Sequence, residues 1–480
     1  MNNAISPEAN RLKKNAIGLG LLVFMVISAA APLTGIAGAI PIAMLLGNGA
    51  GIPGTFILMA IVLAIWGIGF VALARNIRNA GAFYAYSARA LGGRFGGAIA
   101  LMAVLAYNAM MVGLLGLLGG VAAGVFGQFG LNLPWWGWSL IATAIIGILG
   151  YKEAELSAKV LMVLVVLEVL IGLVVAVSIV AKGGAGDLTY NILDPSLIFV
   201  GGGTVAAILF TFGSFIGIEA TAIYAEEVRD ADRTVPKATF LAIFLIGVFY
   251  AFVTWTMVVA TGIDALVPTI AALPDPTLYL FTLAEQYSSG TTAMILGVLL
   301  VSSVFASALA MHNFIARYFY VSGREGLLPS FMGVTHSSHQ SPHVGSVVQT
   351  VLAVVVVVFF AAMGLDPVLN LFTWVAQVSV LGVLTMMAIT SFAVIAYFRK
   401  LPGVEPAWKV LLAPLVSGVV MAAIALYTLI GFGSATGTVA PLSFILPGLV
   451  PAFGVLGYLI AAKLEKADPA RFANMGANRD

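Results

Sequence analysis

Long apolar stretches, separated by short polar or charged ones, recur along the whole 480-residue chain. A helix needs roughly 20 predominantly apolar residues to cross the hydrocarbon core of a bilayer, and the stretches are of about that length. The pattern predicts an all-α membrane protein with twelve spanning helices, placed at residues 16–46, 53–75, 93–126, 135–151, 156–181, 202–227, 238–262, 289–321, 346–363, 370–398, 407–432 and 440–463.

The composition agrees with a membrane location. The chain is 61% hydrophobic and 9% charged, whereas soluble domains carry about 25% charged residues. The net charge of +2 is too small for a nucleic-acid-binding surface, and the lack of cysteine excludes disulfides and thiolate chemistry. The apolar segment after MNNAISPEANRLKKN is longer than a signal-peptide core, so we expect the first helix to remain in the mature protein.

The basic residues predict the orientation of these helices. Cytoplasmic loops of membrane proteins carry an excess of lysine and arginine. With twelve spans, every lysine and arginine except Lys182 falls on the side that holds both chain ends. We therefore expect a multi-pass protein of the cytoplasmic membrane, with cytoplasmic tails at 1–15 and 464–480 on either side of a single transmembrane domain at 16–463.

Two of the predicted helices carry residues that interrupt a helix near the middle of the membrane. The first contains SAAAPLTGIAG at 28–38, and the sixth contains FGSFIG at 212–217. Proline removes a backbone donor, and glycine tolerates non-helical dihedral angles. Paired interruptions in the two halves of a chain point to a transporter site between inverted repeats. The alternative interpretation is that these residues only let the helices kink or pack closely.

Unwound backbone at this depth is tolerated only where it is buried in protein or lines a water-filled cavity. The freed N–H and C=O groups are then available to a ligand. The half-helix that follows Gly35 presents N–H groups and a positive dipole end to an anion such as a carboxylate. Carbonyl groups at both interruptions can accept hydrogen bonds from an ammonium group. The sequence therefore predicts a site for a small zwitterion or cation.

Acidic residues lie inside or next to the predicted helices. Glu168 is the only charge well inside the span at 156–181, where an acid is costly and by default functional. It either exchanges a proton or, when ionised, binds Na⁺; the alternative is a protonated structural acid bonded to a neighbouring helix. Glu219 follows the second interruption and either couples substrate binding to closure or braces loose backbone. The charged cluster from Glu226 to Arg233 is expected in a solvated cytoplasmic loop.

Three stretches resemble the amino acid–polyamine–organocation (APC) superfamily. The likeness lies in FGSFIGIEATAIYAEEVRDADRTVPKA (212–238), similar to the sixth helix and the loop after it, in RNIRNAGAFYAYSARALGGRFG (75–96), similar to the second-to-third loop, and in ARYFYVSGREGLLPSF (316–331), similar to the end of the eighth helix. The resemblance implies a five-plus-five inverted repeat with helices 1 and 6 broken and two additional helices, which corresponds here to 16–181, 202–398 and 407–463.

The resemblance also implies which residues hold the substrate. In the first helix, the Ala31 carbonyl would accept a hydrogen bond from a substrate amine, and Thr34 with Gly35 would hold the substrate carboxylate. In the sixth helix, the carbonyls of Gly213 and Ile216 would complete the amine site. These are the groups that the two interruptions set free.

Two positions depart from the superfamily pattern. Many members carry a large aromatic residue where this chain has Gly213, so Phe212 or Phe215 would substitute for it, or the pocket would accept a bulkier side chain. The pocket residue on the eighth helix is Met311, a soft and adaptable side chain, in place of a flat aromatic one. The substrate therefore does not follow from the resemblance.

The resemblance places Glu168 at a coupling position. It aligns with a lysine that proton-coupled members carry where sodium-coupled relatives bind their ion. In that fold Ser307 on the eighth helix would be its neighbour. We favour proton coupling, with Na⁺ coupling as the alternative.

Together these features predict a secondary active transporter of amino acids or related amines, working by alternating access as a proton symporter. An amino acid/polyamine exchanger and a Na⁺-coupled carrier are the alternatives. An enzyme is disfavoured because no nucleophile–base pair stands out at membrane depth, and a channel because no ring of charges or filter loop does.

No cofactor or metal is expected, since an ion gradient drives transport and the histidines at 336, 339 and 343 lack a helical framework. Expected partners are the substrate and lipid but no nucleic acid, with the protein a monomer or homodimer.

Overall fold

The computed structural model describes residues 17–79, 81–152 and 155–477, without the side chains of 155–161. These residues form helices and no strand. The helices are α1 Leu19–Ala30, α2 Ile40–Leu46, α3 Ile52–Asn76, α4 Phe83–Leu91, α5 Gly93–Gly127, α6 Trp135–Tyr151, α7 Glu155–Ala181, α8 Pro195–Ile198, α9 Gly203–Gly213, α10 Ala220–Ile223, α11 Ala231–Thr261, α12 Ile263–Ala271, α13 Tyr279–Tyr287, α14 Gly290–Arg324, α15 His343–Ala362, α16 Thr373–Phe398, α17 Ala413–Thr436, α18 Leu442–Ala467 and α19 Pro469–Ala473. Short π-helices occupy Thr34–Ala39, Pro367–Phe372 and Trp408–Leu412, and short 3₁₀-helices occupy Gly49–Gly51, Pro276–Leu278 and Ser330–Gly333.

Ten segments of the described chain are long and apolar enough to cross a membrane. They are Leu19–Leu46, Gly49–Asn76, Gly93–Gly127, Met162–Ala181, Ala231–Thr261, Gly290–Arg324, His343–Ala362, Pro367–Phe398, Trp408–Thr436 and Leu442–Ala467. The two remaining predicted spans, at 135–151 and 202–227, contain shorter apolar helices, α6 and α9. The membrane class is thereby supported, whereas the count of twelve spans stays a prediction.

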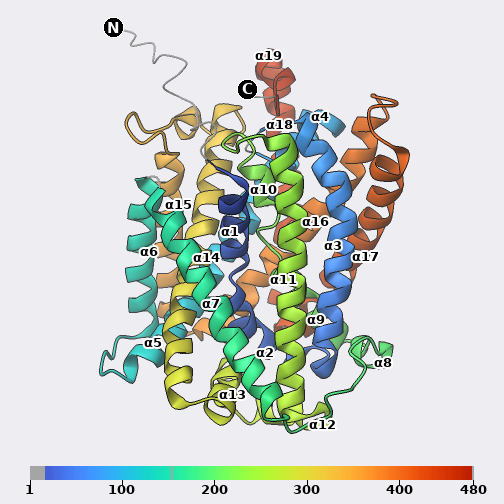
Figure 1. Ribbon diagram of the computed structural model, residues 1–480. Helices are drawn as coiled ribbons and strands as arrows, with labels where there is room; N and C mark the ends of the chain where they lie inside the picture. The colour runs from blue at the N-terminus through green and yellow to red at the C-terminus, as the bar shows by residue number, and fades with distance from the viewer. Residues whose placement is uncertain (1–16, 80, 153–154, 478–480) are drawn as a thin grey trace.

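Several short helices lie between the long ones and were not expected from the sequence. The stretch interpreted as the second-to-third loop contains α4, and the stretch between Asp264 and Glu285 is largely helical as α12 and α13. A search for long apolar runs misses such elements because each has only nine residues. In Figure 1, α4 and α19 lie at the upper end of the bundle and α8, α12 and α13 at the lower end.

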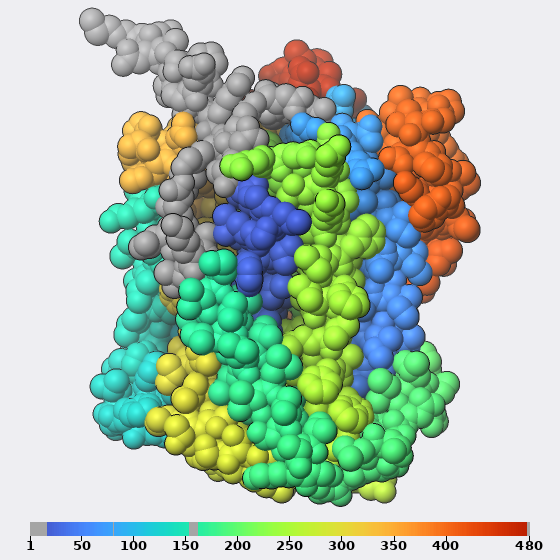
Figure 2. All heavy atoms as spheres, viewed as in Figure 1, coloured from blue at the N-terminus to red at the C-terminus, as the bar shows by residue number. Residues whose placement is uncertain are grey.

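The helices divide into a buried centre and a periphery. In the apolar windows of α5 and α16, 78% of the residues are buried, whereas the figure is 28% for α15, α17 and α18. Helix α1 packs against α7, α11 and α14, and Figure 2 shows it between α7 and α11 on one face of the molecule. The peripheral helices expose large apolar side chains, as expected for surfaces that meet lipid.

The first interruption lies at Ala31, between α1 and the π-helix Thr34–Ala39. Ala31 precedes Pro32, whose ring disfavours the α-helical conformation for the residue before it. Ala31 adopts a left-handed conformation instead, with φ 45° and ψ 79°. The helix thus ends at Ala30, and helical conformation resumes at Pro32.

The second interruption lies between α9 and α10, where residues 214–219 form turns. Gly217 has φ 115°, a conformation that favours glycine. A Cβ at Gly217 would lie 2.6 Å from the Cβ of Ala29, so the two interruptions touch each other. The lack of a side chain at residue 217 is what permits this close approach.

Candidate functional site

A cavity lies between the two interrupted helices and the central helices α5, α14 and α16. Its volume is about 50 Å³, room for roughly four water molecules. Its lining consists of Ala29, Ala30, Ala31, Thr34, Gly35, Ala39, Met110, Leu114, Phe210, Gly213, Ser214, Ile216, Ser307, Met311, Phe372, Ala376, Gln377 and Val380.

Most of the predicted substrate-binding residues share this lining. Ala31, Thr34 and Gly35 from the first interruption meet Gly213 and Ile216 from the second across the cavity, together with Met311 and Ser307 of α14. Phe212 and Phe215 are buried but lie outside the lining. The aromatic residues that reach the cavity are Phe210 and Phe372, so neither of the two expected aromatic substitutes for Gly213 lies at the cavity.

Side chains from other helices satisfy the carbonyls at the end of α1. The Tyr250 hydroxyl, on α11, lies 3.2 Å from the Ala30 carbonyl oxygen and 3.4 Å from that of Ala31. Ser307 Oγ donates to the Ala29 carbonyl at 2.8 Å. A helix end leaves such acceptors without a partner in its own helix, and a Cβ at Gly35 would overlap the Tyr250 ring. Glycine at residue 35 is therefore required by the close approach of Tyr250.

The backbone donors after the interruption are engaged as well. The N–H of Thr34 donates to Ser303 Oγ at 3.2 Å, and the N–H of Gly35 donates to the Ala31 carbonyl at 3.1 Å. The two amides expected to hold a carboxylate are thus bonded within the protein in this conformation.

Glu219 braces the second interruption. One carboxylate oxygen accepts from the N–H of Gly217 at 2.9 Å, and the other accepts from the Tyr107 hydroxyl of α5 at 2.7 Å. The side chain is fully buried and lies outside the cavity lining. These contacts favour the structural interpretation of Glu219.

Glu168 is joined to the cavity by a chain of hydrogen bonds. It is fully buried, and its carboxylate accepts from Ser303 Oγ at 2.6 Å. Ser303 Oγ in turn accepts from the Thr34 hydroxyl at 3.0 Å, and Thr34 lines the cavity. The carboxylate also faces the backbone N–H of Leu33, directly after the interruption.

The hydroxyl bonded to Glu168 is not the one predicted. Ser307 was expected beside Glu168, but Ser303, one helical turn earlier on α14, makes the contact, while Ser307 bonds to Ala29. Both serines lie on the same face of α14 because residues four apart are neighbours on a helix. The sequence does not fix the depth at which α7 packs against α14, and that depth selects Ser303.

Among the residues at or near the cavity that the sequence did not single out, three are polar residues of the long helices: Ser303, Tyr250 and Gln377. Each is a polar residue inside a long apolar run and each is almost fully buried. Because buried polar groups need partners, isolation in an apolar run was an available signal. It is shared by many other serines and threonines of the chain, so it does not single these three out.

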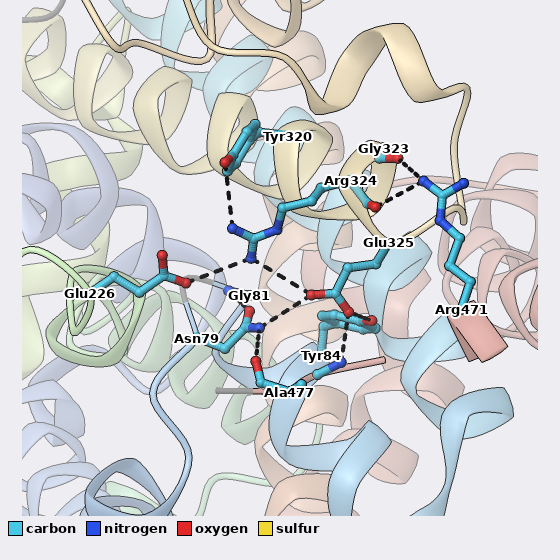
Figure 3. A network of polar contacts seen from close by, with 11 residues as sticks. Asn79, Gly81, Tyr84, Glu226, Tyr320, Gly323, Arg324, Glu325, Arg471 and Ala477 are labelled. Atoms are coloured by element: carbon cyan, nitrogen blue, oxygen red, sulfur yellow. Dashed lines mark hydrogen bonds and ion pairs between the residues drawn. The ribbon is translucent and has the colours of Figure 1, made fainter. Parts of the chain in front are cut away.

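An ion-pair network lies at the upper end of the bundle in Figure 1. Arg324 lies 3.7 Å from carboxylate oxygens of both Glu226 and Glu325, and Figure 3 shows its guanidinium between them. Arg317 forms a second pair with Glu227, with nitrogen–oxygen distances of 3.1, 2.9 and 3.3 Å. The two pairs tie the end of α14 to the segment after α10.

The C-terminal segment takes part in the same network (Figure 3). Arg471 of α19 donates to the backbone carbonyls of Gly323 and Arg324 at 3.1 and 2.8 Å. The N–H of Gly476 donates to Glu325 at 2.6 Å, and Tyr84 of α4 bonds to the same carboxylate. The end of α14 and the segment from Arg471 to Gly476 are thus held together.

The burial of the acidic cluster corrects a prediction. Glu226 and Glu227 were expected in a solvated loop, but their side chains are 8% and 7% exposed. Arg229 and Asp230 are exposed, as expected. A charge pattern predicts ion pairs but not which of them the surrounding helices bury.

Comparisons with known proteins agree with this architecture. A model of the family described as amino acid permease matches residues 22–467. The chain is 25% identical over 325 residues to the low-affinity putrescine importer PlaP of Escherichia coli K12, covering 64% of this chain and 67% of that protein. It is 30% identical over 229 residues to the histidine permease HisP of Lactococcus lactis, covering 44% and 46%. It is 25% identical over 339 residues to the branched-chain amino acid permease BcaP of Bacillus subtilis, covering 70% and 65%.

Proposed function

The chain belongs to the amino acid permease family, and from this premise we propose that it is a secondary active transporter that carries a neutral amino acid by proton symport. The observation that carries the proposal is the buried cavity enclosed by two interrupted helices. Interrupted helices that meet at mid-membrane supply main-chain groups to a small charged ligand.

The lining supports an amino acid over a diamine. Within the described residues no charged side chain lines the cavity, and the acids nearby, Glu168 and Glu219, lie outside it. A buried charge needs a partner. The carbonyls of Ala31 and Gly213 can accept one ammonium group. A second ammonium, at the other end of a diamine, would find no carboxylate in the lining, where Gln377 is polar but uncharged and Met110, Leu114 and Phe372 are apolar. The relatives include a putrescine importer and amino acid permeases, and this lining favours the latter class.

Substrate binding then competes with hydrogen bonds that these groups make within the protein. The ammonium group takes the place of the Tyr250 hydroxyl at the Ala31 carbonyl. The carboxylate accepts from the Thr34 hydroxyl, which otherwise donates to Ser303. Both exchanges replace one hydrogen bond by a charge-assisted one, which is stronger.

The hydrogen-bonded chain from Glu168 to Thr34 supports coupling to protons. An ionised carboxylate only accepts hydrogen bonds, whereas a protonated one also donates. When Glu168 gains a proton, it can donate to Ser303 Oγ, and the Thr34 hydroxyl is then free to turn toward the substrate carboxylate. Proton binding and substrate binding therefore favour each other.

The network at the upper end acts as the closed inner gate in this proposal. Orientation by the positive-inside rule puts that end in the cytoplasm. The buried Arg317–Glu227 pair and the Arg324 network hold it shut. Alternating access requires these pairs to separate when the cavity opens inward.

Replacing Glu227 with glutamine is expected to favour the inward-open state, because Arg317 loses the carboxylate that it holds from α14. Since the chain has no cysteine, Met311→Cys provides a unique thiol in the cavity. An impermeant reagent added at the Glu227 face is expected to label this thiol about tenfold faster or more. The reason is that loss of a buried ion pair strongly destabilises the closed conformation.

The matched control for this experiment is Glu465→Gln. It removes a carboxylate from the Arg94–Glu465 pair, whose side chains are 44% and 37% exposed, and exposed pairs contribute little. Labelling should be unchanged in this control. Equal labelling of the Glu227→Gln variant and the parent would contradict the gate.

The transport activity itself is tested in proteoliposomes. Saturable uptake of a radiolabelled neutral amino acid, with counterflow against the unlabelled compound, is the expected result. A thermal-shift screen against amino acids and polyamines identifies the compounds to use. Stabilisation by diamines, but by no amino acid, would overturn the assignment of the substrate class.

A further inference from the structure

Gln377 differs from the other polar side chains of the cavity in having no partner. It lies on α16, lines the cavity and is 2% exposed. Within the described part of the chain its amide makes no hydrogen bond, and its buried Oε1 is unsatisfied. The other polar lining side chains are all bonded: Thr34 to Ser303, Ser214 to the Phe210 carbonyl and Ser307 to the Ala29 carbonyl.

An unpaired amide at this depth is unusual in a folded protein, because buried polar groups almost always find partners. The side chain could form several hydrogen bonds, since a carboxamide has two donor hydrogens and an acceptor oxygen. It faces the cavity in which the proposed substrate binds. A ligand that supplies both a donor and an acceptor at this place would relieve the desolvation cost.

Gln377 lies on the side of the cavity that α16 forms, near the second interruption. Val380, one turn along α16, lies beside the open face of Gly213, where a Cβ would come within 3.1 Å of its Cγ2 atom. The lining side chains from α5 and from the segment before α16 are Met110, Leu114 and Phe372, all apolar. The amide is thus one polar group in an otherwise apolar wall.

We propose that Gln377 determines specificity by hydrogen-bonding the side chain of the substrate, and that the preferred substrate is an amino acid whose neutral side chain both donates and accepts. A carboxamide side chain, as in glutamine or asparagine, matches the amide of Gln377 group for group. An aliphatic or thioether side chain leaves the amide buried and unpaired. A site built to bond a polar group rejects the analogue that lacks it far more strongly than an apolar pocket rejects a polar isostere.

The inference rests on the proposed function, because it assigns the side-chain end of the same site. It is tested by the ratio of affinities for glutamine and methionine, two substrates of similar length, measured by competition against a labelled amino acid in proteoliposomes. The parent protein is expected to prefer glutamine. In Gln377→Met the glutamine affinity is expected to fall about fivefold or more, while methionine binds as well as before or better.

Gln349→Met is the matched control. Gln349 is a second fully buried glutamine, on α15, bonded to the sulfur of Met111 and outside the cavity lining. Its replacement should leave the ratio unchanged. A change of the ratio in Gln377→Met alone supports the assignment.

The failures are distinguishable. If both proteins transport amino acids and the glutamine-to-methionine ratio is the same in the parent and in Gln377→Met, the role of Gln377 is overturned while the proposed function stands. If the parent binds neither amino acid, and no other amino acid displaces a label, the proposed function fails and the inference fails with it. Should Gln377→Met not fold, Gln377→Leu gives the same comparison with a smaller side chain.

Discussion

Glu168→Gln is expected to abolish proton-driven accumulation of substrate while exchange of labelled for unlabelled substrate continues. Glutamine has nearly the shape of a protonated glutamate and can still bond to Ser303, but it cannot release a proton. The site would therefore keep its geometry and lose its coupling. Under an imposed pH gradient, uptake into proteoliposomes would stop when the substrate concentration inside equals that outside. Counterflow of labelled substrate would remain.

The geometry makes this effect specific to Glu168. Its carboxylate is linked through Ser303 to Thr34 by bonds of 2.6 and 3.0 Å, so its protonation state bears directly on a residue of the cavity. Glu285→Gln is the control, because Glu285 on α13 is an exposed acid and its loss should leave gradient-driven uptake intact.

Two outcomes would contradict the coupling role of Glu168. Undiminished pH-driven uptake by Glu168→Gln would show that the acid is structural. Accumulation driven by a Na⁺ gradient in the parent, with no response to pH, would show that Glu168 serves a cation site instead. The same vesicles serve both measurements.

Gly213→Trp is expected to lower substrate affinity by about 100-fold or to block binding, because extra side-chain volume in a packed site has nowhere to go. Gly213 lines the cavity, and even a Cβ there would come within 3.1 Å of Val380. An indole is a large, rigid ring system, so at residue 213 it would occupy the space in which the substrate is proposed to bind. Competition binding with a labelled amino acid measures the change.

Two further variants separate occlusion from misfolding. Gly213→Ala adds only a methyl group, which Val380 can accommodate by a small shift, so a partial loss is expected. Gly124→Trp places the same indole on α5, where nothing lies within 4 Å of the added Cβ, and binding should be retained. Unaltered affinity for bulky substrates in Gly213→Trp would remove Gly213 from the binding site.

Much of the fold could be predicted because the bilayer imposes its own length on each helix. The predicted spans at 93–126 and 289–321 end within three residues of α5 and α14. Short helices such as α4 were not predicted, because α4 has only nine residues of mixed polarity and does not cross the bilayer, so no fixed apolar length marks it in the sequence. The relation between the two halves as inverted repeats remains a prediction.

The candidate site was predictable at the level of the backbone. Pro32 constrains Ala31 through local sterics alone, and Gly217 is free to take a positive φ, so both interruptions follow from neighbouring residues. The side chains that complete the site do not. Ser303 and Thr34 are 269 residues apart in sequence, and only the packing of the π-helix Thr34–Ala39 against α14 brings them together.

The sequence by itself determined that the chain is a membrane protein, which segments form its long helices and at which residues two of them are interrupted. It did so because the length of an apolar run, proline and glycine act locally. The tertiary structure alone decided that Ser303 and not Ser307 meets Glu168, that Tyr250 occupies the carbonyls of α1 and that Gln377 faces the cavity unpaired. These outcomes depend on the relative depth and rotation of packed helices, which small differences in close packing set and which no local pattern records.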